Sequence, residues 1–364
     1  MSKLKKKIPF RMWILLPICL ISLLIVWILT MAANHYKESL IPQHAASRWK
    51  EDGAIAQISC FFSVNTGVMP ESIEDFEHNL DSALEQASIV VESPQASARL
   101  WADAYSASGK ISVKSNISEI TTDCIGIGGD FFLFHPLPLL SGSYFSGNDV
   151  MQDYCVLDRE AAWKLFGSND VAGQIVYIAD VAHVVTGVVE HEDSDWYKAA
   201  GLDSGMIYVS YDSLQKYGSS NGINHFEILM PNPVKGYARE YVQGNIGVPE
   251  SEMDLVENSA RYDFLNQCKH IGKLSTRSMN GKAIIYPYWE NVARAMDDKL
   301  AYLLMIRLLF LAIVVMIVIA EIWRYWKHKT WTCKGVLQKA YHNLALKISR
   351  TRQRKKFEKQ KKQQ

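Results

Sequence analysis

The densest group of residues that could do chemistry is the run EHEDSD, from Glu190 to Asp195. Its carboxylate oxygens suit Ca²⁺, and its imidazole suits Zn²⁺. The run lacks the glycine and the distal glutamate of an EF-hand loop, and adjacent acids in an exposed loop after a strand are usually solvated. His191, Glu192 and Asp193 are therefore weak candidates for metal ligands, and we expect no bound metal and no cofactor.

The six cysteines offer redox or metal chemistry, but no two of them form a C-x-x-C pair. Zinc-ribbon and thioredoxin-type sites are therefore unsupported. A free cysteine in a strand-like apolar run behaves as a small hydrophobic residue, and the alternative is a disulfide among the four cysteines in the middle of the chain. These four are Cys60, Cys124, Cys155 and Cys268.

A catalytic constellation is not visible in the sequence. Serine, histidine and aspartate all occur, but there is neither a G-x-S-x-G elbow nor an H-E-x-x-H motif. His135 lies between Phe134 and Pro136, a setting that favours a structural role over a catalytic one. The sequence therefore predicts a protein that is not an enzyme.

The chain that carries these residues is flanked by two long apolar runs. The first run covers residues 12–33. A helix of about 20 apolar residues crosses a bilayer, and Pro17 can kink such a helix near its start without forbidding it. The alternative is a cleaved signal peptide, because the run ends in TMAA. The run exceeds the roughly 7–15 apolar residues of a signal core, however. An uncleaved transmembrane helix is therefore predicted.

Residues 300–323 form the second apolar run and the second predicted transmembrane helix. Arg307 lies near one end of it, where a long basic side chain can snorkel to the headgroups. The alternatives for Arg307 are a helix–helix contact or a gating charge. Trp323, Tyr325 and Trp326 follow in the pattern of an aromatic belt at a membrane interface.

The charges of the chain are segregated around these runs. Residues 1–33 carry five basic and no acidic residues, and residues 300–364 carry 15 basic and two acidic ones, which leaves 19 basic and 36 acidic residues between them. By the positive-inside rule, the basic N-terminus (1–11) and the basic tail (324–364) are predicted to be cytoplasmic and residues 34–299 extracytoplasmic. The tail is expected to lie against anionic membrane lipid, and nucleic-acid binding is not expected.

The segment 34–299 mixes helical and strand-like patterns, which predicts an α+β domain. One helix begins with a proline and presents apolar residues at three- and four-residue spacings. A second helix is predicted from Arg159 to Phe166, with Gly167 as its C-terminal stop. Residues 174–190 predict a hairpin whose turn falls near Ala179–Asp180, and a further helix is expected over 260–275. The apolar positions of the first helix are Ile73, Phe76, Leu80, Leu84 and Ala87.

The apolar, glycine-rich stretch 124–149 is neither a third span nor a phosphate loop. A third span would place the two basic ends on opposite sides of the membrane, and its glycines fit neither G-x-x-x-x-G-K-[ST] nor G-x-G-x-x-G before a helix. We expect a strand that ends in glycines, followed by a proline-stiffened connection. Its apolar residues Phe131, Phe132, Phe134 and Leu137 are expected to pack into the core.

The same stretch, together with YCVLDREAAWKLFGSNDVAGQIVYIADVAHVVTGVVE, is similar to the MacB-like periplasmic core domain of ABC-type permeases. The shared pattern is a strand ending in glycine, an acid–aromatic pair and a large-Gly-x-x-Phe turn. A helix ending in Leu-Phe-Gly, a second glycine and a hairpin closing on Gly-Val-Val follow, and the match covers about residues 120–215. The matching residues are Gly126, Asp130, Phe131, Phe132, Gly142, Phe145, Leu165, Phe166, Gly167, Gly173, Gly187 and Val188.

The resemblance implies a permease-like, non-catalytic membrane subunit of an ABC-type transport or mechanotransmission assembly. Two features depart from the family pattern: family members usually continue into two further spans, and an arginine common after the turn glycine is Ser143 here. No Walker A motif occurs, so the expected partners are a separate ABC ATPase, a second permease subunit or both, and a homo-oligomer is also possible. The competing hypothesis is an extracytoplasmic sensor or scaffold that binds a ligand or a cell-envelope partner.

Residues 275–299 are expected to lie just outside the membrane and to matter for function. One interpretation is an aromatic interfacial collar that leads into the second span. The other is a joint that transmits force between the outer domain and the membrane. The residues proposed for such coupling are Arg277, Tyr288, Trp289 and, inside the span, Arg307.

Overall fold

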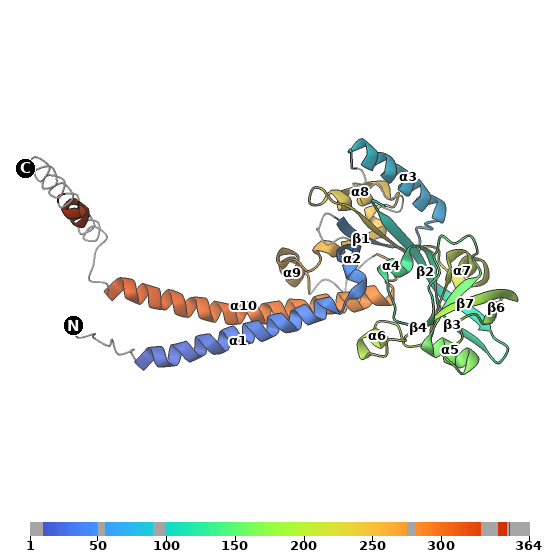
Figure 1. The fold of residues 1–364 in the computed structure, drawn as a ribbon, viewed down its shortest axis with the longest axis horizontal. Helices are drawn as coiled ribbons and strands as arrows, with labels where there is room; N and C mark the ends of the chain where they lie inside the picture. Colours follow the sequence, from blue (N-terminus) through green and yellow to red (C-terminus); the bar gives the residue numbers. More distant parts are fainter. Residues whose placement is uncertain are drawn as a thin grey trace, which may run out of the picture. The chain divides into compact units, whose positions relative to one another are not determined.

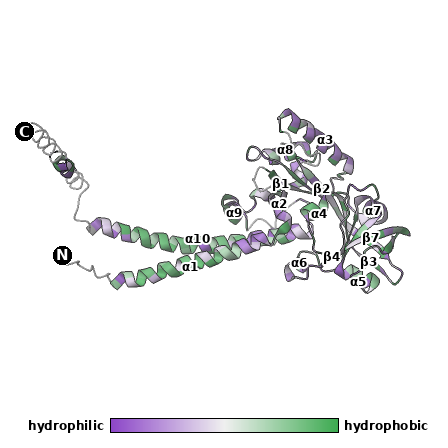
Figure 2. Cartoon of the chain, in the orientation of Figure 1, coloured by the Kyte–Doolittle hydropathy of each residue, from purple (hydrophilic) through white to green (hydrophobic). Residues whose placement is uncertain are grey.

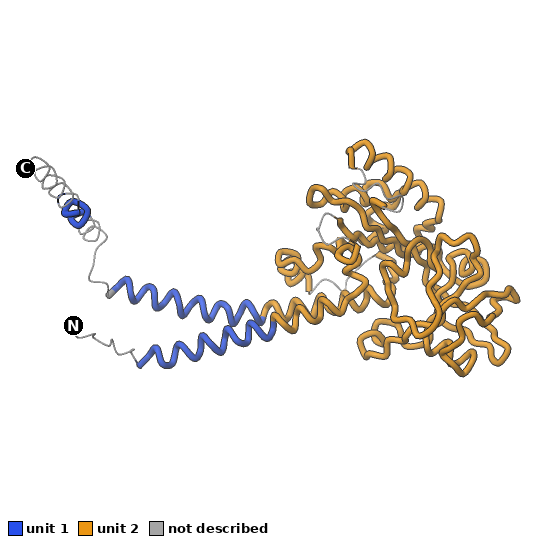
Figure 3. Tube along the Cα trace, viewed as in Figure 1, with its two compact units in different colours: residues 1–29, 306–364 blue, residues 30–305 orange. Residues whose placement is uncertain are grey.

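The computed structural model describes residues 10–49, 55–89, 99–274, 282–328, 341–347 and 349. The chain divides into two compact units (Figure 3). Unit 1 combines residues 1–29 with residues 306–364, and unit 2 is the continuous stretch 30–305. Each unit has its own fold.

Unit 1 contains most of the two long apolar helices. Helix α1 spans Phe10–Glu38 and α10 spans Tyr288–His328, and both are long and apolar enough to cross a membrane. Figure 2 shows the hydrophobic colour along α1 and along the unit 1 part of α10. Both helices extend beyond the predicted spans 12–33 and 300–323, and α10 begins well before residue 300. The predicted apolar runs are thus the central parts of longer helices.

Unit 2 is built on one mixed sheet that, in the part of the chain described, has 11 strands (Figure 1). The main order is β11-β1-β10-β2-β3-β8-β5-β7-β4, with β6 paired to β2 and β7, and β9 to β2. Most neighbours are antiparallel, whereas β3/β8 and β5/β7 are parallel. The strands are β1 (Ile55–Phe62), β2 (Ala102–Lys114), β3 (Glu119–Gly129), β4 (Leu139–Gly142), β5 (Tyr154–Asp158), β6 (Ile175–Ile178), β7 (Val181–Val189), β8 (Met206–Ser210), β9 (Ser219–Ser220), β10 (His225–Pro231) and β11 (Met253–Glu257).

Short helices cover both faces of this sheet. Helices α3, α5, α7 and α8 pack on one face, called here the α3 face. Helices α2 and α4 and the first turn of α10 pack on the other, called here the α10 face. The shorter helical elements of unit 2 are η1 (Ile41–His44), α2 (Ala45–Trp49), α3 (Pro70–Gln86), α4 (Phe131–Phe134), α5 (Arg159–Phe166), α6 (Asp195–Ala199), α7 (Tyr211–Tyr217), α8 (Tyr237–Asn245), η2 (Glu250–Glu252), η3 (Asn258–Ala260) and α9 (Phe264–Ile271).

Strand alternation decides which side chains reach each face. In β10, Phe226 and Ile228 join the core of the α3 face, whereas Leu229 joins that of the α10 face. Because successive side chains of a strand point to opposite sides, His225 and Glu227 share the α10 face with Leu229. All residues of β1 and β10 are buried. The central strands are therefore covered on both sides.

The predicted local elements of unit 2 are largely confirmed. Helix α5 has the predicted bounds, and Gly167 ends it in the left-handed conformation at φ +69°. Ala179 and Asp180, both at positive φ, form the predicted hairpin turn between β6 and β7. The first helix buries four of the five predicted apolar positions, but Ala87 lies beyond its last turn and is exposed. The helix expected over 260–275 is the shorter α9.

The glycine-rich stretch confirms the expected strand that ends in glycines, but the connection after it contains the short helix α4 and strand β4, and Leu137 is only partly buried. Strand β3 ends at Gly129, which has φ +64°, and α4 follows as a single turn that buries Phe131 and Phe134. A Cβ on Gly129 would lie 2.6 Å from the backbone oxygen of Asp103. A glycine is therefore needed where β3 turns into α4, and this turn carries His135 to the α10 face.

Candidate functional site

The strongest candidate site is where α10 starts inside unit 2. Pro287 immediately precedes this helix, and its carbonyl accepts hydrogen bonds from the amides of Glu290 and Asn291. A proline just before a helix suits the chain there, because its missing N–H would have no partner within the helix. We call the contacts of residues 288–305 with the rest of unit 2 the α10 joint.

Trp289 is the aromatic anchor of the α10 joint. It is 3% exposed, and its ring centroid lies 5.7 Å from that of Phe131, 4.4 Å from that of His135 and 5.3 Å from that of His225. The hydroxyl of the preceding Tyr288 lies 3.1 Å from that of Tyr208 in β8. Trp289 therefore belongs to the core of the α10 face, and the interpretation of this residue as part of an exposed interfacial collar is wrong.

A buried arginine clamps the same helix from the side. Arg261 follows η3, and its guanidinium donates to both carboxylate oxygens of Glu290 at 2.8 and 3.0 Å. It also donates to Asp297, at 2.7 Å for the shortest contact. Glu290 and Asp297 lie seven residues apart, about two helical turns, so they share one side of α10. The side chains of Arg261 and Glu290 are 7% and 2% exposed, which makes this a desolvated ionic cluster.

Further contacts surround this clamp. Arg294 lies 3.1 Å from Asp254 of β11, and His270 of α9 lies 3.0 Å from Asp298. On another side of the helix, Val292 and Met296 pack with Leu40 in a small apolar cluster. The first turns of α10 are thus held by ionic and apolar contacts together.

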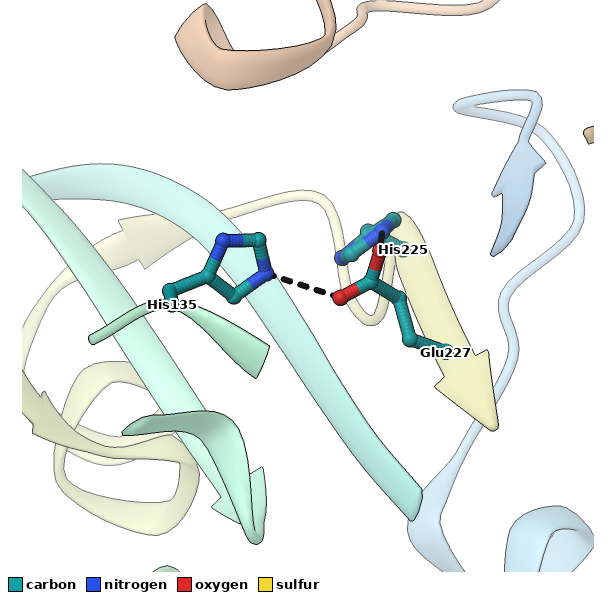
Figure 4. Close-up of side chains that lie close together, drawn as sticks. All are labelled: His135, His225 and Glu227. Atoms are coloured by element: carbon teal, nitrogen blue, oxygen red, sulfur yellow. Dashed lines mark ion pairs between the residues drawn. The ribbon is translucent and has the colours of Figure 1, made fainter. Parts of the chain in front are cut away.

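Beneath Trp289 lies a buried polar cluster of His135, His225 and Glu227 (Figure 4). His135 Nε2 lies 2.8 Å and His225 Nε2 3.4 Å from the carboxylate of Glu227. Burial alone would raise the pKa of Glu227, but the two imidazoles outweigh it and hold that pKa below its usual range. Burial lowers the pKa of His135, and Glu227 offsets part of this effect.

A cavity of about 160 Å³ opens beside the cluster, with His135, Tyr288 and Trp289 in its wall. Asp158 and His191 line it as well, and His191 Nδ1 lies 2.7 Å from Asp158 Oδ2. Burial raises the pKa of Asp158, although the amides that it accepts from and His191 oppose this rise. The cavity therefore borders both buried histidine–carboxylate groups of the α10 face.

The three weak metal-ligand candidates of the EHEDSD run do not converge. His191 is buried on Asp158, and its other ring nitrogen is 3.9 Å from Asp193. Asp193 pairs instead with Arg159 at 2.6 Å, and Glu192 is exposed. The run serves mainly as a charged cap on the start of α5.

Of the proposed coupling residues, Tyr288 and Trp289 lie together in the α10 joint. Arg307 lies on α10 within unit 1, and Arg277 lies outside the described residues.

Of the family-pattern glycines, Gly126 lies against Leu214 of α7, and Gly187 lies inside β7 against the backbone of Ser143. Gly142 ends β4, Gly167 ends α5, and Gly173 has a positive φ in the turn before β6.

Arg261 and the pair of His225 and Glu227 were not predicted from the sequence. For the pair, a usable signal was present, because the order His-Phe-Glu in an apolar strand puts two ionisable groups on one side of a buried strand. For Arg261 there was none, because its partners lie on a distant helix.

The chain is similar to a family of known proteins. Residues 23–235, more than half of the chain, match the family model of the MacB-like periplasmic core domain. Among curated proteins, the macrolide export ATP-binding/permease protein MacB of Chromobacterium violaceum is 32% identical over 97 residues, 26% of this chain and 14% of that protein. MacB 2 of Aeromonas hydrophila is 27% identical over 155 residues, 42% of this chain and 22% of that protein. The chain thus spans less than a quarter of the length of either relative.

Two solved structures are also similar. The periplasmic region of MacB from Actinobacillus actinomycetemcomitans is 18% identical with a TM-score of 0.39, over 59% of this chain and 92% of that one. The extracellular domain of the ABC-type transporter YknZ from Gram-positive bacteria is 16% identical with a TM-score of 0.37, over 55% of this chain and 99% of that one.

Proposed function

The chain belongs to the MacB-like periplasmic core domain family, and from that premise we propose that it is a permease-like membrane subunit of an ABC-type transport or mechanotransmission assembly. The curated relatives are named as export proteins with an ATP-binding and a permease part. The present sequence contains no G-x-x-x-x-G-K-[ST] phosphate loop. We assign ATP hydrolysis to an ABC ATPase partner and a non-catalytic role to the domain and helices described here.

The proposed topology follows from charge and apolar length. The helices α1 and α10 supply two membrane spans, and the basic segments beyond them lie in the cytoplasm. Residues 34–299, with 36 acidic and 19 basic residues, face outward. The outer domain is then joined to the membrane at both of its ends.

One observation carries the proposed mechanism: α10 is a single helix from the core of the outer domain to the end of the second apolar run. Trp289 and Arg261 fix its first turns in unit 2. A helix without a break transmits a shift or rotation along its axis, because its backbone hydrogen bonds are continuous. Movement of residues 300–323, driven by a partner ATPase, would therefore reach α4 and β10 directly.

Co-purification tests the proposed assembly. The full chain, carrying an affinity tag, is extracted from its host in a mild detergent, and the bound proteins are identified by mass spectrometry. We expect an ABC-type ATPase at a stoichiometric level, with or without a second permease. Recovery of this chain alone, or with a cell-envelope ligand and no ATPase, would instead support the sensor or scaffold hypothesis.

A second experiment tests the role of the continuous helix. Two glycines inserted between Met305 and Ile306 interrupt α10 at the boundary of the two units. The matched control is the same insertion after Asn221, in an exposed turn of unit 2. We expect both variants to retain the ATPase, whereas only the first should lose the cargo-dependent or partner-dependent stimulation of ATP hydrolysis. Equal stimulation in both variants would contradict the proposed mechanism.

A further inference from the structure

The three side chains beneath Trp289 form the one group of potential metal ligands found in the part of the chain that the structure describes. One donor atom from each of His135, His225 and Glu227 lies within 4.8 Å of the others. Figure 4 shows His135, from the segment after α4, facing the carboxylate of Glu227, which lies beside His225 on strand β10. All three residues are at most 3% exposed.

The contacts within this group do not satisfy its polar atoms. His135 Nε2, His225 Nε2 and Glu227 Oε2 are buried and make no hydrogen bond of acceptable geometry, although His135 Nε2 lies only 2.8 Å from Glu227 Oε2. Buried polar atoms that lack a well-aligned hydrogen bond are costly in a protein interior. Two ring nitrogens and one carboxylate oxygen within 4.8 Å of one another are a donor set that suits a divalent transition metal.

The surrounding side chains hold the donors in orientations suited to a metal. Ser106 Oγ lies 3.2 Å from His225 Nδ1, so the hydrogen bond on that nitrogen leaves Nε2 facing the group. Ser59 donates to Glu227 Oε1 at 2.5 Å, which keeps Oε2 for a further partner. Rings of Phe131 and Phe61 stack on the two imidazoles at 4.5 and 4.9 Å. Outer contacts of this type orient ligands in known metal centres.

We propose that His135, His225 and Glu227 form a buried site for a divalent transition metal of the Zn²⁺ class, directly under the first turn of α10. Tetrahedral Zn²⁺ with bonds of about 2.0–2.2 Å would place its donors about 3.3 Å apart, so the widest pair must close by about 1.5 Å. The adjoining cavity of about 160 Å³, which His135 lines, supplies an entry path and room for a water as fourth ligand. The metal would tie the turn after α4 to β10 and so stiffen the floor of the α10 joint. This proposal does not depend on the identity of the partner ATPase.

Direct metal binding by the full chain in detergent tests the site. The protein carries a tag without histidines, is stripped with a chelator and is then dialysed with Zn²⁺ or with Co²⁺ as a spectroscopic substitute. We expect about one tightly held Zn²⁺ per chain by elemental analysis, and visible Co²⁺ absorption of tetrahedral intensity. Metal that the wild type does not retain, or a Co²⁺ spectrum of purely octahedral type, would overturn the proposal.

Substitutions then assign the ligands. Glu227→Gln keeps the shape of the side chain and removes the carboxylate, and it should weaken Zn²⁺ binding at least about tenfold, as should His225→Gln. The matched control is His183→Gln, because His183 is also a buried strand histidine but pairs with Ser213 and Val181. The control should keep the wild-type metal content. Zn²⁺ should also raise the unfolding temperature of the wild type and of the control but not of Glu227→Gln.

Variants that fail to fold are recognised by their circular dichroism, and the wild-type Co²⁺ spectrum alone then decides the proposal. Equal Zn²⁺ content in the wild type, Glu227→Gln and His225→Gln would show that the bound metal lies elsewhere and would overturn it.

Discussion

The two faces of the central sheet hold their helices by different means. On the α3 face, the core consists mainly of aliphatic and aromatic side chains, such as Leu80 of α3 and Leu214 of α7. On the α10 face, polar groups lie in the core itself, among them Glu227 and Ser59 on neighbouring strands. The same strands supply both sets, because β1 and β10 send alternate residues to opposite sides.

This difference matches what each face is connected to. The helices of the α3 face begin and end within unit 2, whereas α10 continues from the α10 face into the second apolar run. Apolar packing has no directional requirement, but a bidentate arginine clamp has a narrow geometry. The clamp of Arg261 therefore fixes the position of α10 more sharply than burial alone would. Under the proposed mechanism, the α10 face holds the helix that transmits force, whereas the α3 face only has to be stable.

Replacement of Arg261 by alanine should produce the largest loss of stability and would sharpen the comparison. It leaves Glu290 and Asp297 as buried charges without their common partner, and breaking such a cluster typically costs about 3–5 kcal/mol. Chemical unfolding of the full chain in detergent, followed by near-UV circular dichroism, measures the change. The control is Arg99→Ala. Arg99 pairs with Asp130 in a more exposed ion pair, and the loss of this pair should cost at most about 1 kcal/mol. Equal effects of the two substitutions would show that the buried Arg261 cluster stabilises the fold no more than an exposed ion pair does.

Leu80→Ala should be almost as damaging on the α3 face, but for a different reason. Leu80 is fully buried in the middle of α3, so alanine leaves a cavity, and such changes cost about 2–5 kcal/mol. We expect the variant that survives folding to keep normal stimulation of the partner ATPase, because Leu80 packs in the core of the α3 face and Trp289 in the core of the α10 face. Trp289→Ala, by contrast, should reduce the stimulation of the partner ATPase, because Trp289 anchors α10 in the core of the α10 face. If Leu80→Ala uncoupled the assembly while Trp289→Ala did not, the assignment of roles to the two faces would be reversed.

The α3 face has one ionisable pair at its margin, which allows a test by pH. Asp103 of β2 is buried opposite Glu77 of α3, and burial together with the Glu77 charge raises the pKa of Asp103 well above its usual range. The folded state therefore binds a proton more tightly than the unfolded state does. The stabilising effect is complete below pH of about 4 and is lost as the pH rises through the raised pKa.

Asp103→Asn should consequently raise the unfolding temperature at pH 7 and have less effect at pH 5. Unfolding scans of both proteins across this range give the difference, which reports the titration of Asp103 together with that of its partner Glu77. The matched control is Asp81→Asn, since Asp81 lies nearby on the same helix as Glu77 but is exposed. A difference that does not change with pH, or one that grows as the pH falls, would show that Asp103 is ionised in the folded protein.

The comparison also explains which parts of the molecule the sequence could predict. Local patterns were sufficient for α3 and α5 and for the hairpin at Ala179–Asp180, because apolar spacing and turn residues act within a few positions. The length of the apolar runs predicted the two candidate spans, and the family pattern of residues 120–215 predicted the fold of the domain between them. These features are all properties of short windows of the chain.

The α10 joint could not be predicted in this way. A tryptophan beside an apolar run is typical both of a membrane interface and of a protein core. Only the position of β10 and α4 beneath Trp289 distinguishes these two settings. Arg261 stands among ordinary polar residues, and its partners become neighbours only once η3 and α10 pack together. His135 meets Glu227 because β3 runs beside β2 and β2 beside β10. Sites formed by such long-range contacts carry little local signal.

The smallest expected effect concerns the charged cap that the EHEDSD run forms with Arg159. Arg159 pairs with Glu190 and Asp193, but its side chain is 39% exposed, so water and salt screen these contacts. Arg159→Ala should therefore lower the free energy of unfolding by about 0–1 kcal/mol, and less at high salt. The measurement is the same unfolding series at two salt concentrations, with Lys164→Ala as control because Lys164 pairs with Glu160 at comparable exposure. A loss of several kcal/mol that salt does not reduce would mean that the cap is structural in the manner of Arg261, and the contrast between buried and exposed charge in this domain would no longer hold.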